Sequence, residues 1–72
     1  MQYEEFRRQL GKAGLTNRAF AELLDLNPIS ISNLKSKVEV PYQLALIASF
    51  MADYKDKGLD FMAIIEKCTP SS

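Results

Sequence analysis

All three asparagines of this 72-residue chain lie in one stretch, residues 16–37. Carboxamides stand at Asn17, Asn27 and Asn33, and the lysines Lys35 and Lys37 follow them. A carboxamide donates and accepts hydrogen bonds at once, whereas an ammonium group only donates and carries a positive charge. Such groups are suited to recognising a polar surface. Residues that could catalyse a reaction would have to lie elsewhere in the chain.

The residues that most often serve catalysis and metal binding are missing or badly placed. The chain has no histidine and a single cysteine, Cys68, which excludes an internal disulfide, a thiolate–imidazole pair and the usual zinc sites. The neighbours Glu4 and Glu5 would point about 100° apart on a helix and would not face each other. We therefore expect no enzymatic activity, no cofactor and no metal site, and we interpret Cys68 as a small buried or tail residue without a redox role.

Charge is balanced overall but unevenly distributed. The nine basic and nine acidic residues cancel, which argues against a non-specific binder of polyanions. Residues 1–37 hold six basic and four acidic residues, whereas residues 38–72 hold three basic and five acidic ones. This split is consistent with a basic face on the N-terminal half.

Length and hydropathy indicate one domain without a membrane span. A chain of 72 residues has room for one modest core and not for a second domain. Its longest apolar stretch, residues 44–52, is interrupted by Ser49 and is far shorter than the ~20 residues that a spanning helix requires. Charged residues within 1–20 argue against a secretory signal. We expect a cytoplasmic protein with no membrane partner, in which a domain over residues 1–68 precedes a flexible tail over residues 69–72.

Apolar periodicity and capping residues predict an all-α fold, a compact bundle of about five short helices. Phe6 and Leu10 recur at helical spacing among charged residues. Thr16 is a favourable N-cap, and the pair Asn27 and Pro28 suits the start of another helix. The expected helices cover residues 2–13, 17–24, 28–36, 41–57 and 59–67, and residues 38–40 are expected to be extended because they precede Pro41.

Two of these helices, 17–24 and 28–36, carry the apolar pattern of a helix-turn-helix. Ala21 is small enough to let the two helix backbones approach. The side chains expected to meet between the helices are Phe20, Leu24 and Leu26 from the first, and Ile31 and Leu34 from the second. The outer face of the second helix is then left free, as a helix that enters a DNA major groove about 12 Å wide requires.

The stretch TNRAFAELLDLNPISISNLKSK, residues 16–37, resembles the helix-turn-helix of lambda-repressor-like (XRE family) regulators. The five-helix pattern covers nearly the whole chain, as that family's domain does. Asp25 stands where the family usually has glycine in the turn, and aspartate adopts left-handed backbone conformations more readily than most residues other than glycine. The glycine that often follows the family's recognition helix is missing around residues 36 and 37. The resemblance implies a sequence-specific transcriptional regulator, a repressor, that reads the major groove of double-stranded DNA with the helix beginning near Pro28.

The same resemblance assigns roles to individual residues. Asn33 would pair with an adenine edge, Ser32 would donate to or accept from either base, and Ile29 would contact a thymine methyl group. The base-reading residues would be Asn27, Pro28, Ile29, Ser32, Asn33 and Ser36. Phosphate contacts, which set the register without reading sequence, would come from Thr16, Asn17, Arg18, Lys35 and Lys37.

Other interpretations of these residues stay open. Each polar residue of 28–36 would also suit a solvated helix face, and Ile29 would also suit the edge of the core. Arg7 and Arg8 are interpreted as ordinary solvated residues. The broad apolar surface of residues 41–67 indicates a homodimer held by the last two helices or, as an alternative function, a small helical protein–protein interaction module. No small-molecule ligand is implied.

Overall fold

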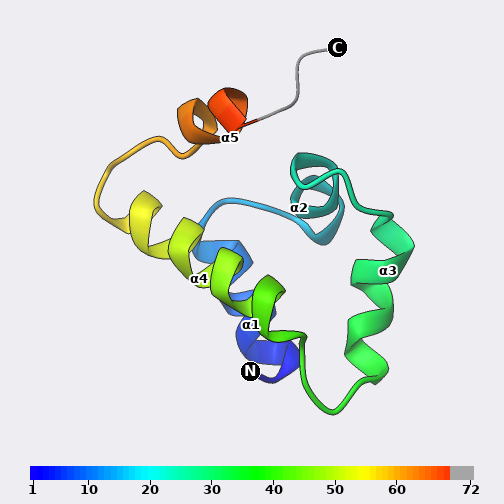
Figure 1. Ribbon diagram of the computed structural model, residues 1–72. Helices are drawn as coiled ribbons and strands as arrows, with labels where there is room; N and C mark the ends of the chain where they lie inside the picture. Colours follow the sequence, from blue (N-terminus) through cyan, green and yellow to red (C-terminus); the bar gives the residue numbers. More distant parts are fainter. Residues whose placement is uncertain (69–72) are drawn as a thin grey trace.

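Residues 1–68, the part of the chain that the computed structural model describes, form helices joined by short turns, with no strand among them. The elements follow one another as α1 (Tyr3–Lys12), α2 (Asn17–Leu23), α3 (Pro28–Ser32), the 3₁₀ helix η1 (Asn33–Ser36), α4 (Tyr42–Asp56) and α5 (Met62–Cys68). Figure 1 shows this order along the chain. The prediction of an all-α bundle of about five short helices is confirmed, while the tail predicted at 69–72 lies outside the described residues.

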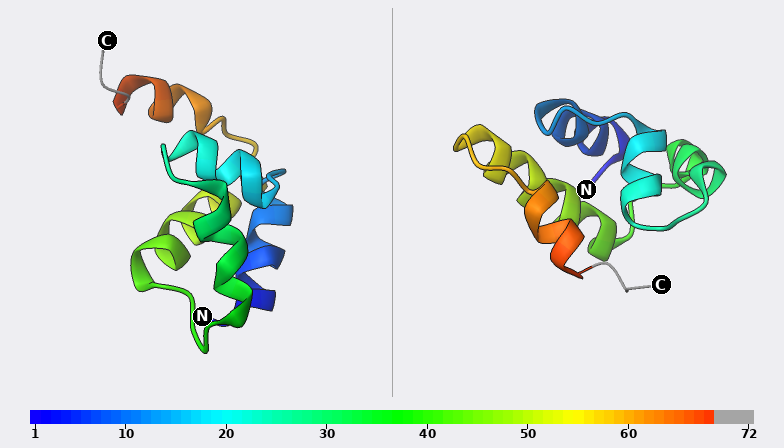
Figure 2. Two further views of the ribbon diagram at one scale, coloured as in Figure 1. Left: turned by 90° about the vertical axis from the view of Figure 1, so that its right-hand side faces the viewer. Right: turned by 90° about the horizontal axis from the view of Figure 1, so that it is seen from above.

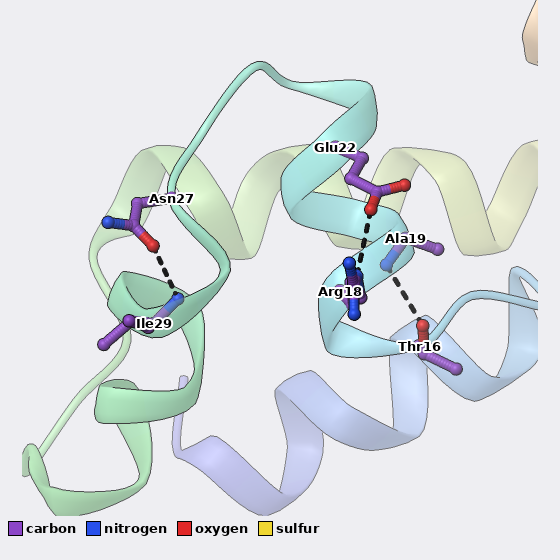
Figure 3. A network of polar contacts seen from close by, with 6 residues as sticks. All are labelled: Thr16, Arg18, Ala19, Glu22, Asn27 and Ile29. Atoms are coloured by element: carbon purple, nitrogen blue, oxygen red, sulfur yellow. Dashed lines mark hydrogen bonds and ion pairs between the residues drawn. The ribbon is translucent and has the colours of Figure 1, made fainter.

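Three helices begin where a side chain accepts a hydrogen bond from a free backbone N–H group of the first turn. Thr16 Oγ1 accepts from the N–H three residues on, at 3.0 Å, and Asn27 Oδ1 from the N–H two residues on, at 2.9 Å (Figure 3). Asp60 Oδ1 accepts from the N–H of Met62 at 3.0 Å. Each cap satisfies a donor that the helix itself cannot pair. The sequence predicts that this helix begins at residue 59. The Asp60 cap explains why α5 begins at Met62 instead.

The helices α1, α2 and α4 all end in the same kind of turn, which contains one residue in the left-handed region. That residue is Gly14 after α1 (φ 76°), Asp25 after α2 (φ 57°) and Gly58 after α4 (φ 77°). In each turn the N–H of the next residue bonds to the carbonyl five positions earlier, at 2.8, 2.8 and 3.1 Å respectively. This Schellman arrangement satisfies carbonyl groups that the helix leaves unpaired. Asp25 therefore takes the conformation that glycine takes in the other two turns.

The core is built from apolar residues that α1, α2, α3, η1 and α4 turn inward. Phe6 and Phe20 are fully buried and meet edge to face, with ring centroids 5.4 Å apart and an interplanar angle of 84°; this geometry is favourable for two aromatic rings. α1 and α4 lie side by side (Figure 2). Small side chains on α4 let the two backbones approach, and the buried ones are Ala45, Ala48 and Ala52.

The helices α2 and α3 pack against each other across the turn that Asp25 closes. Most of the residues predicted to meet there are buried, namely Phe20, Ala21, Ile31 and Leu34, and Leu24 is half-buried. Leu26 differs from the prediction, because 39% of its surface is exposed. It lies in the turn after α2, where its N–H folds back onto Ala21, so its side chain is not part of the inner face of either helix.

The helix predicted over 28–36 is not α-helical throughout. After Ser32 the chain tightens into the 3₁₀ winding of η1, and Ser36 Oγ donates to the carbonyl of Asn33 at 2.9 Å. A serine hydroxyl that bonds to a nearby carbonyl competes with α-helical hydrogen bonding, which accounts for the change. Further on, the N–H of Val40 bonds to the carbonyl of Met1 at 2.9 Å and ties the N-terminus to the segment that follows η1.

The last helix, α5, is the least buried element. None of its residues is buried, and it is attached to the rest mainly through the buried Phe61 just before it and the half-buried Ile65 within it. Apolar side chains remain exposed on it, among them Met62 and Ile64. None of the helices in residues 1–68 has both the length and the apolar character that crossing a membrane demands.

Candidate nucleic-acid interface

The outer face of α3 and η1 carries three of the residues predicted to read bases. Successive residues of a helix are turned by about 100°, so burying Ile31 and Leu34 turns Ile29, Ser32 and Asn33 away from the core. All three are exposed, and Ile29 is exposed over 66% of its surface, so it does not belong to the core. This face therefore presents an apolar group, a hydroxyl and a carboxamide together.

The remaining residues predicted to read bases are partly occupied within the protein. Asn27 uses its Oδ1 atom to cap α3, which leaves its Nδ2 donors for a ligand (Figure 3). The hydroxyl proton of Ser36 is used by the carbonyl of Asn33, and Pro28 is half-buried. Ser32 and Asn33 differ, since their side chains form no hydrogen bond within residues 1–68. Ser32 and Asn33 are thus the polar side chains of this face with full hydrogen-bonding capacity to offer.

Residues predicted to contact phosphates lie on both sides of this face. Thr16 caps α2, and Arg18 Nε lies 3.1 Å from Glu22 Oε1 in an ion pair whose two side chains are exposed (Figure 3). Exposed pairs of this kind contribute little to stability, so Arg18 can exchange the carboxylate for another anion. Lys35 and Lys37 are exposed, and neither forms an ion pair with a carboxylate of the described part of the chain.

The structure adds a contact that sequence reasoning missed, at the start of α2. Asn17 Nδ2 donates a hydrogen bond of 2.8 Å to the phenol oxygen of Tyr3 on α1. Partial burial would raise the pKa of the Tyr3 phenol, but the hydrogen bond from Asn17 and the neighbouring Arg7 and Lys35 cations outweigh it and hold the pKa below its ordinary 10.0. Tyr3 and Arg7 stand four residues apart, which places them on one helix face; nothing in the sequence says that this face meets Asn17, 14 residues from Tyr3.

A second surface feature, an apolar cleft, lies between α4, α5 and the end of α2. It encloses about 390 Å³, and its lining includes Leu24, Phe50, Tyr54, Phe61, Ile64 and Cys68. The thiol of Cys68 is free and exposed, and it belongs to the last residue of α5, so it is neither buried nor part of the tail. Among residues 1–68 no group of three or more cysteine and acidic side chains could hold a metal ion.

In comparisons with known proteins, no protein-family model, curated protein or solved structure matches the chain.

Proposed function

We propose that this chain is a sequence-specific DNA-binding transcriptional regulator, a repressor of the lambda-repressor-like (XRE) type, whose helix-turn-helix is formed by α2 and α3. One observation carries the proposal. The segment formed by α3 and η1 is fixed through Ile31 and Leu34, which are buried, while Ile29, Ser32 and Asn33 stand exposed on its opposite face. An exposed, rigidly held helix face with hydrogen-bonding groups is what a reader of the major groove needs.

Each exposed group of α3 and η1 matches a feature of a base edge. The Asn33 carboxamide can donate from its nitrogen to adenine N7 and accept at its oxygen from the N6 amino group, which is the two-bond pattern of an adenine edge. Ile29 supplies an apolar surface for a thymine methyl group, and Ser32 supplies a hydroxyl for either base. Asn27 contributes its free Nδ2 donors at the start of the helix.

Phosphates on either side of the groove would be held by the cations and N–H groups around this face. The residues proposed for that role are Thr16, Asn17, Arg18, Lys35 and Lys37. Phosphate contacts supply most of the affinity and fix the orientation, whereas base contacts supply the specificity. Net neutrality of the chain fits a protein that relies on a local basic surface and not on its total charge.

The test is a selection of duplexes from a random-sequence pool, followed by gel shifts of the selected duplex and a scrambled duplex at two salt concentrations. We expect enrichment of one sequence and an affinity that falls steeply as salt rises, because phosphate binding releases counterions. If no sequence is enriched and the chain binds neither duplex at low salt, the proposal is wrong.

The apolar surface of α4 and α5 favours a homodimer as the DNA-binding form. Phe50 on α4 and Ile64 on α5 line the same cleft and are exposed over 66% and 47% of their surfaces. A second copy that covers these residues would place two α3 helices on one DNA face, so the preferred site would be an inverted repeat with half-sites about 34–36 Å apart.

The same cleft supports a second candidate function, a small helical module that binds another protein. An interface of apolar side chains would barely respond to salt, in contrast to counterion release from DNA. The salt series described above therefore separates the two functions.

A further inference from the structure

Tyr3 and Arg7 form the face of α1 that meets the DNA-facing part of the molecule. They lie one helical turn apart, and Tyr3 is bound by Asn17 at the start of α2. η1, which carries Lys35, packs against α1, and the bond between Val40 and Met1 holds the N-terminus at the same place. Side chains from three elements thus converge here.

The cations of this cluster have no carboxylate partner. Within residues 1–68, neither Arg7 nor Lys35 forms an ion pair, although acidic residues flank Arg7 on α1. Arg8, the next residue, is different, because its guanidinium lies 3.0 Å from Glu5 Oε2. The two arginines carry the same charge and are both exposed, but only Arg7 can bind an external anion without first giving up a carboxylate partner.

The phenol of Tyr3 is arranged to donate toward the same anion. Its oxygen already accepts a hydrogen bond from Asn17 at 2.8 Å. A phenol has one proton to give in addition to what it accepts. Within residues 1–68 this phenol accepts from Asn17 and donates to no protein acceptor, so its proton is left for an external one.

We propose that Tyr3, Arg7 and Lys35 together bind one backbone phosphate of duplex DNA at the junction of α1 with α2 and η1. The inference extends the proposed DNA-binding function and depends on it. A phosphate group presents several acceptor oxygens, which suits donors that arrive from different helices, and the fork of an arginine fits two of those oxygens at once. Arg7, interpreted from the sequence as a solvated residue, becomes a phosphate ligand, and α1 becomes part of the DNA-binding surface.

The experiment compares Arg7→Ala with the matched variant Arg8→Ala on the duplex selected above and on its scrambled counterpart. Both variants remove one positive charge from adjacent exposed positions, so both change the net charge equally. We expect Arg7→Ala to weaken binding to the two duplexes alike, by roughly tenfold at low salt. It should also lower the slope of log K against log salt by about 0.9, the value for one lost phosphate contact. Arg8→Ala should keep the wild-type slope.

Two further variants identify the chemistry. Arg7→Lys keeps the charge and should keep the slope while losing part of the affinity, because an ammonium lacks the planar fork. Tyr3→Phe keeps the ring and should weaken binding with the slope unchanged, because the phenol is a neutral donor.

The outcomes separate this inference from the function on which it rests. If the wild-type chain binds DNA and Arg7→Ala has the same slope and affinity as Arg8→Ala, the phosphate site is wrong and the DNA-binding function stands. If the wild-type chain binds no duplex, both are wrong. Circular dichroism of the four variants checks that helix content is unchanged, as expected because Arg7 and Arg8 are exposed and Tyr3→Phe keeps the ring of the half-buried Tyr3.

Discussion

The segment formed by α3 and η1 and the helix α5 are both short and both lie at the surface, but they expose opposite chemistry. The first is anchored by Ile31 and Leu34, which are almost fully buried, and apart from Ile29 it exposes polar side chains. α5 has no buried residue and exposes apolar ones, Met62 and Ile64 among them. A firmly anchored polar face is ready to bind as it stands. A loosely attached apolar helix gains stability only when another surface covers it.

The largest expected effect comes from the anchor of α3. Leu34→Ala should lower the free energy of unfolding by about 2–5 kcal/mol, because a buried leucine is lost together with the contact between η1 and the core. Small domains are stable by only about 5–15 kcal/mol in total, so DNA binding should be lost with it. Urea denaturation and a gel shift measure the two effects.

Ile64→Ala in α5 is the matched control. Ile64 is already half exposed in the single chain. At a concentration too low for the proposed dimer, its truncation should therefore lower the free energy of unfolding by less than about 1 kcal/mol. If Leu34→Ala and Ile64→Ala lower the free energy of unfolding equally, the segment formed by α3 and η1 is anchored no more firmly than α5.

The next effect concerns the apolar surface of α4 and α5. Phe50→Glu should dissociate the proposed homodimer, because a charge at the centre of an apolar interface costs about 2–4 kcal/mol, the range of interface hot spots. Sedimentation velocity should show monomer, with an unchanged circular dichroism spectrum. Val38→Glu is the control: Val38 is an apolar residue exposed over 91% of its surface in the segment after η1, away from the cleft, and its replacement should leave the dimer intact. A wild-type chain that sediments as monomer at high micromolar concentration, with and without DNA, would contradict the homodimer.

A smaller effect tests the reading face itself. Asn33→Ala should lower the binding free energy for the selected duplex by about 1–3 kcal/mol. It should also relax the sequence preference mainly at one base pair, because one base contact is lost. Lys37→Ala should instead weaken all sequences alike and lower the salt slope by about one unit. Selection experiments repeated with each variant measure both. Should Asn33→Ala, Ser32→Ala and Ile29→Ala combined leave affinity and preference unchanged, α3 is not the reading element.

The smallest effect is a pH dependence centred on Tyr3. The hydrogen bond from Asn17 on α2 and the cations Arg7 on α1 and Lys35 on η1 lower the pKa of the phenol below 10.0 despite its partial burial. As pH rises toward 10.0, the phenol loses its proton and becomes an anion that repels phosphate, so DNA affinity should fall further for the wild type than for Tyr3→Phe.

Stability should change with the opposite sign over the same range. A group whose pKa is lower in the folded than in the unfolded chain adds stability as pH rises through the folded value, and the gain levels off above the unfolded value of 10.0. Urea denaturation of the wild type and of Tyr3→Phe over this range measures the difference between them. If Tyr3 is not part of the phosphate site, the pH profiles of DNA affinity should be identical for the two chains.

Local rules predicted most of the fold, because the signals lie within a few residues of their effects. Thr16 and Asn27 cap the helices that their positions indicate, and the buried set from Phe20 to Leu34 follows from apolar spacing. The sequence does not predict the 3₁₀ winding of η1, because that winding depends on which backbone carbonyl accepts the Ser36 hydroxyl proton. The exposure of Leu26 depends on the turn conformation at Asp25, which pattern alone does not give.

The site was predicted less completely than the fold for the same reason. Ile29, Ser32 and Asn33 share a face because helical geometry dictates it. The hydrogen bond between Tyr3 and Asn17 joins two helices and spans 14 residues of sequence. It depends on how those helices pack, and the apolar periodicity of a single helix does not predict that packing. Arg7 was therefore indistinguishable from Arg8 until the helices were placed.

The turn after α2 has a consequence for how position 25 would tolerate replacement. An exposed aspartate with no assigned partner ordinarily accepts almost any residue, yet the backbone here sits at φ 57°, where the corresponding turns after α1 and α4 have glycine. In a library of all twenty residues at this position, the variants that still fold would be those whose residue tolerates a left-handed backbone conformation, whatever its charge or polarity. Glycine and asparagine would persist beside aspartate, while valine, isoleucine and threonine would be depleted, since a branched side chain is least compatible with a left-handed residue. Position 25 would then tolerate few residues, although its side chain is exposed and is not among the proposed DNA contacts.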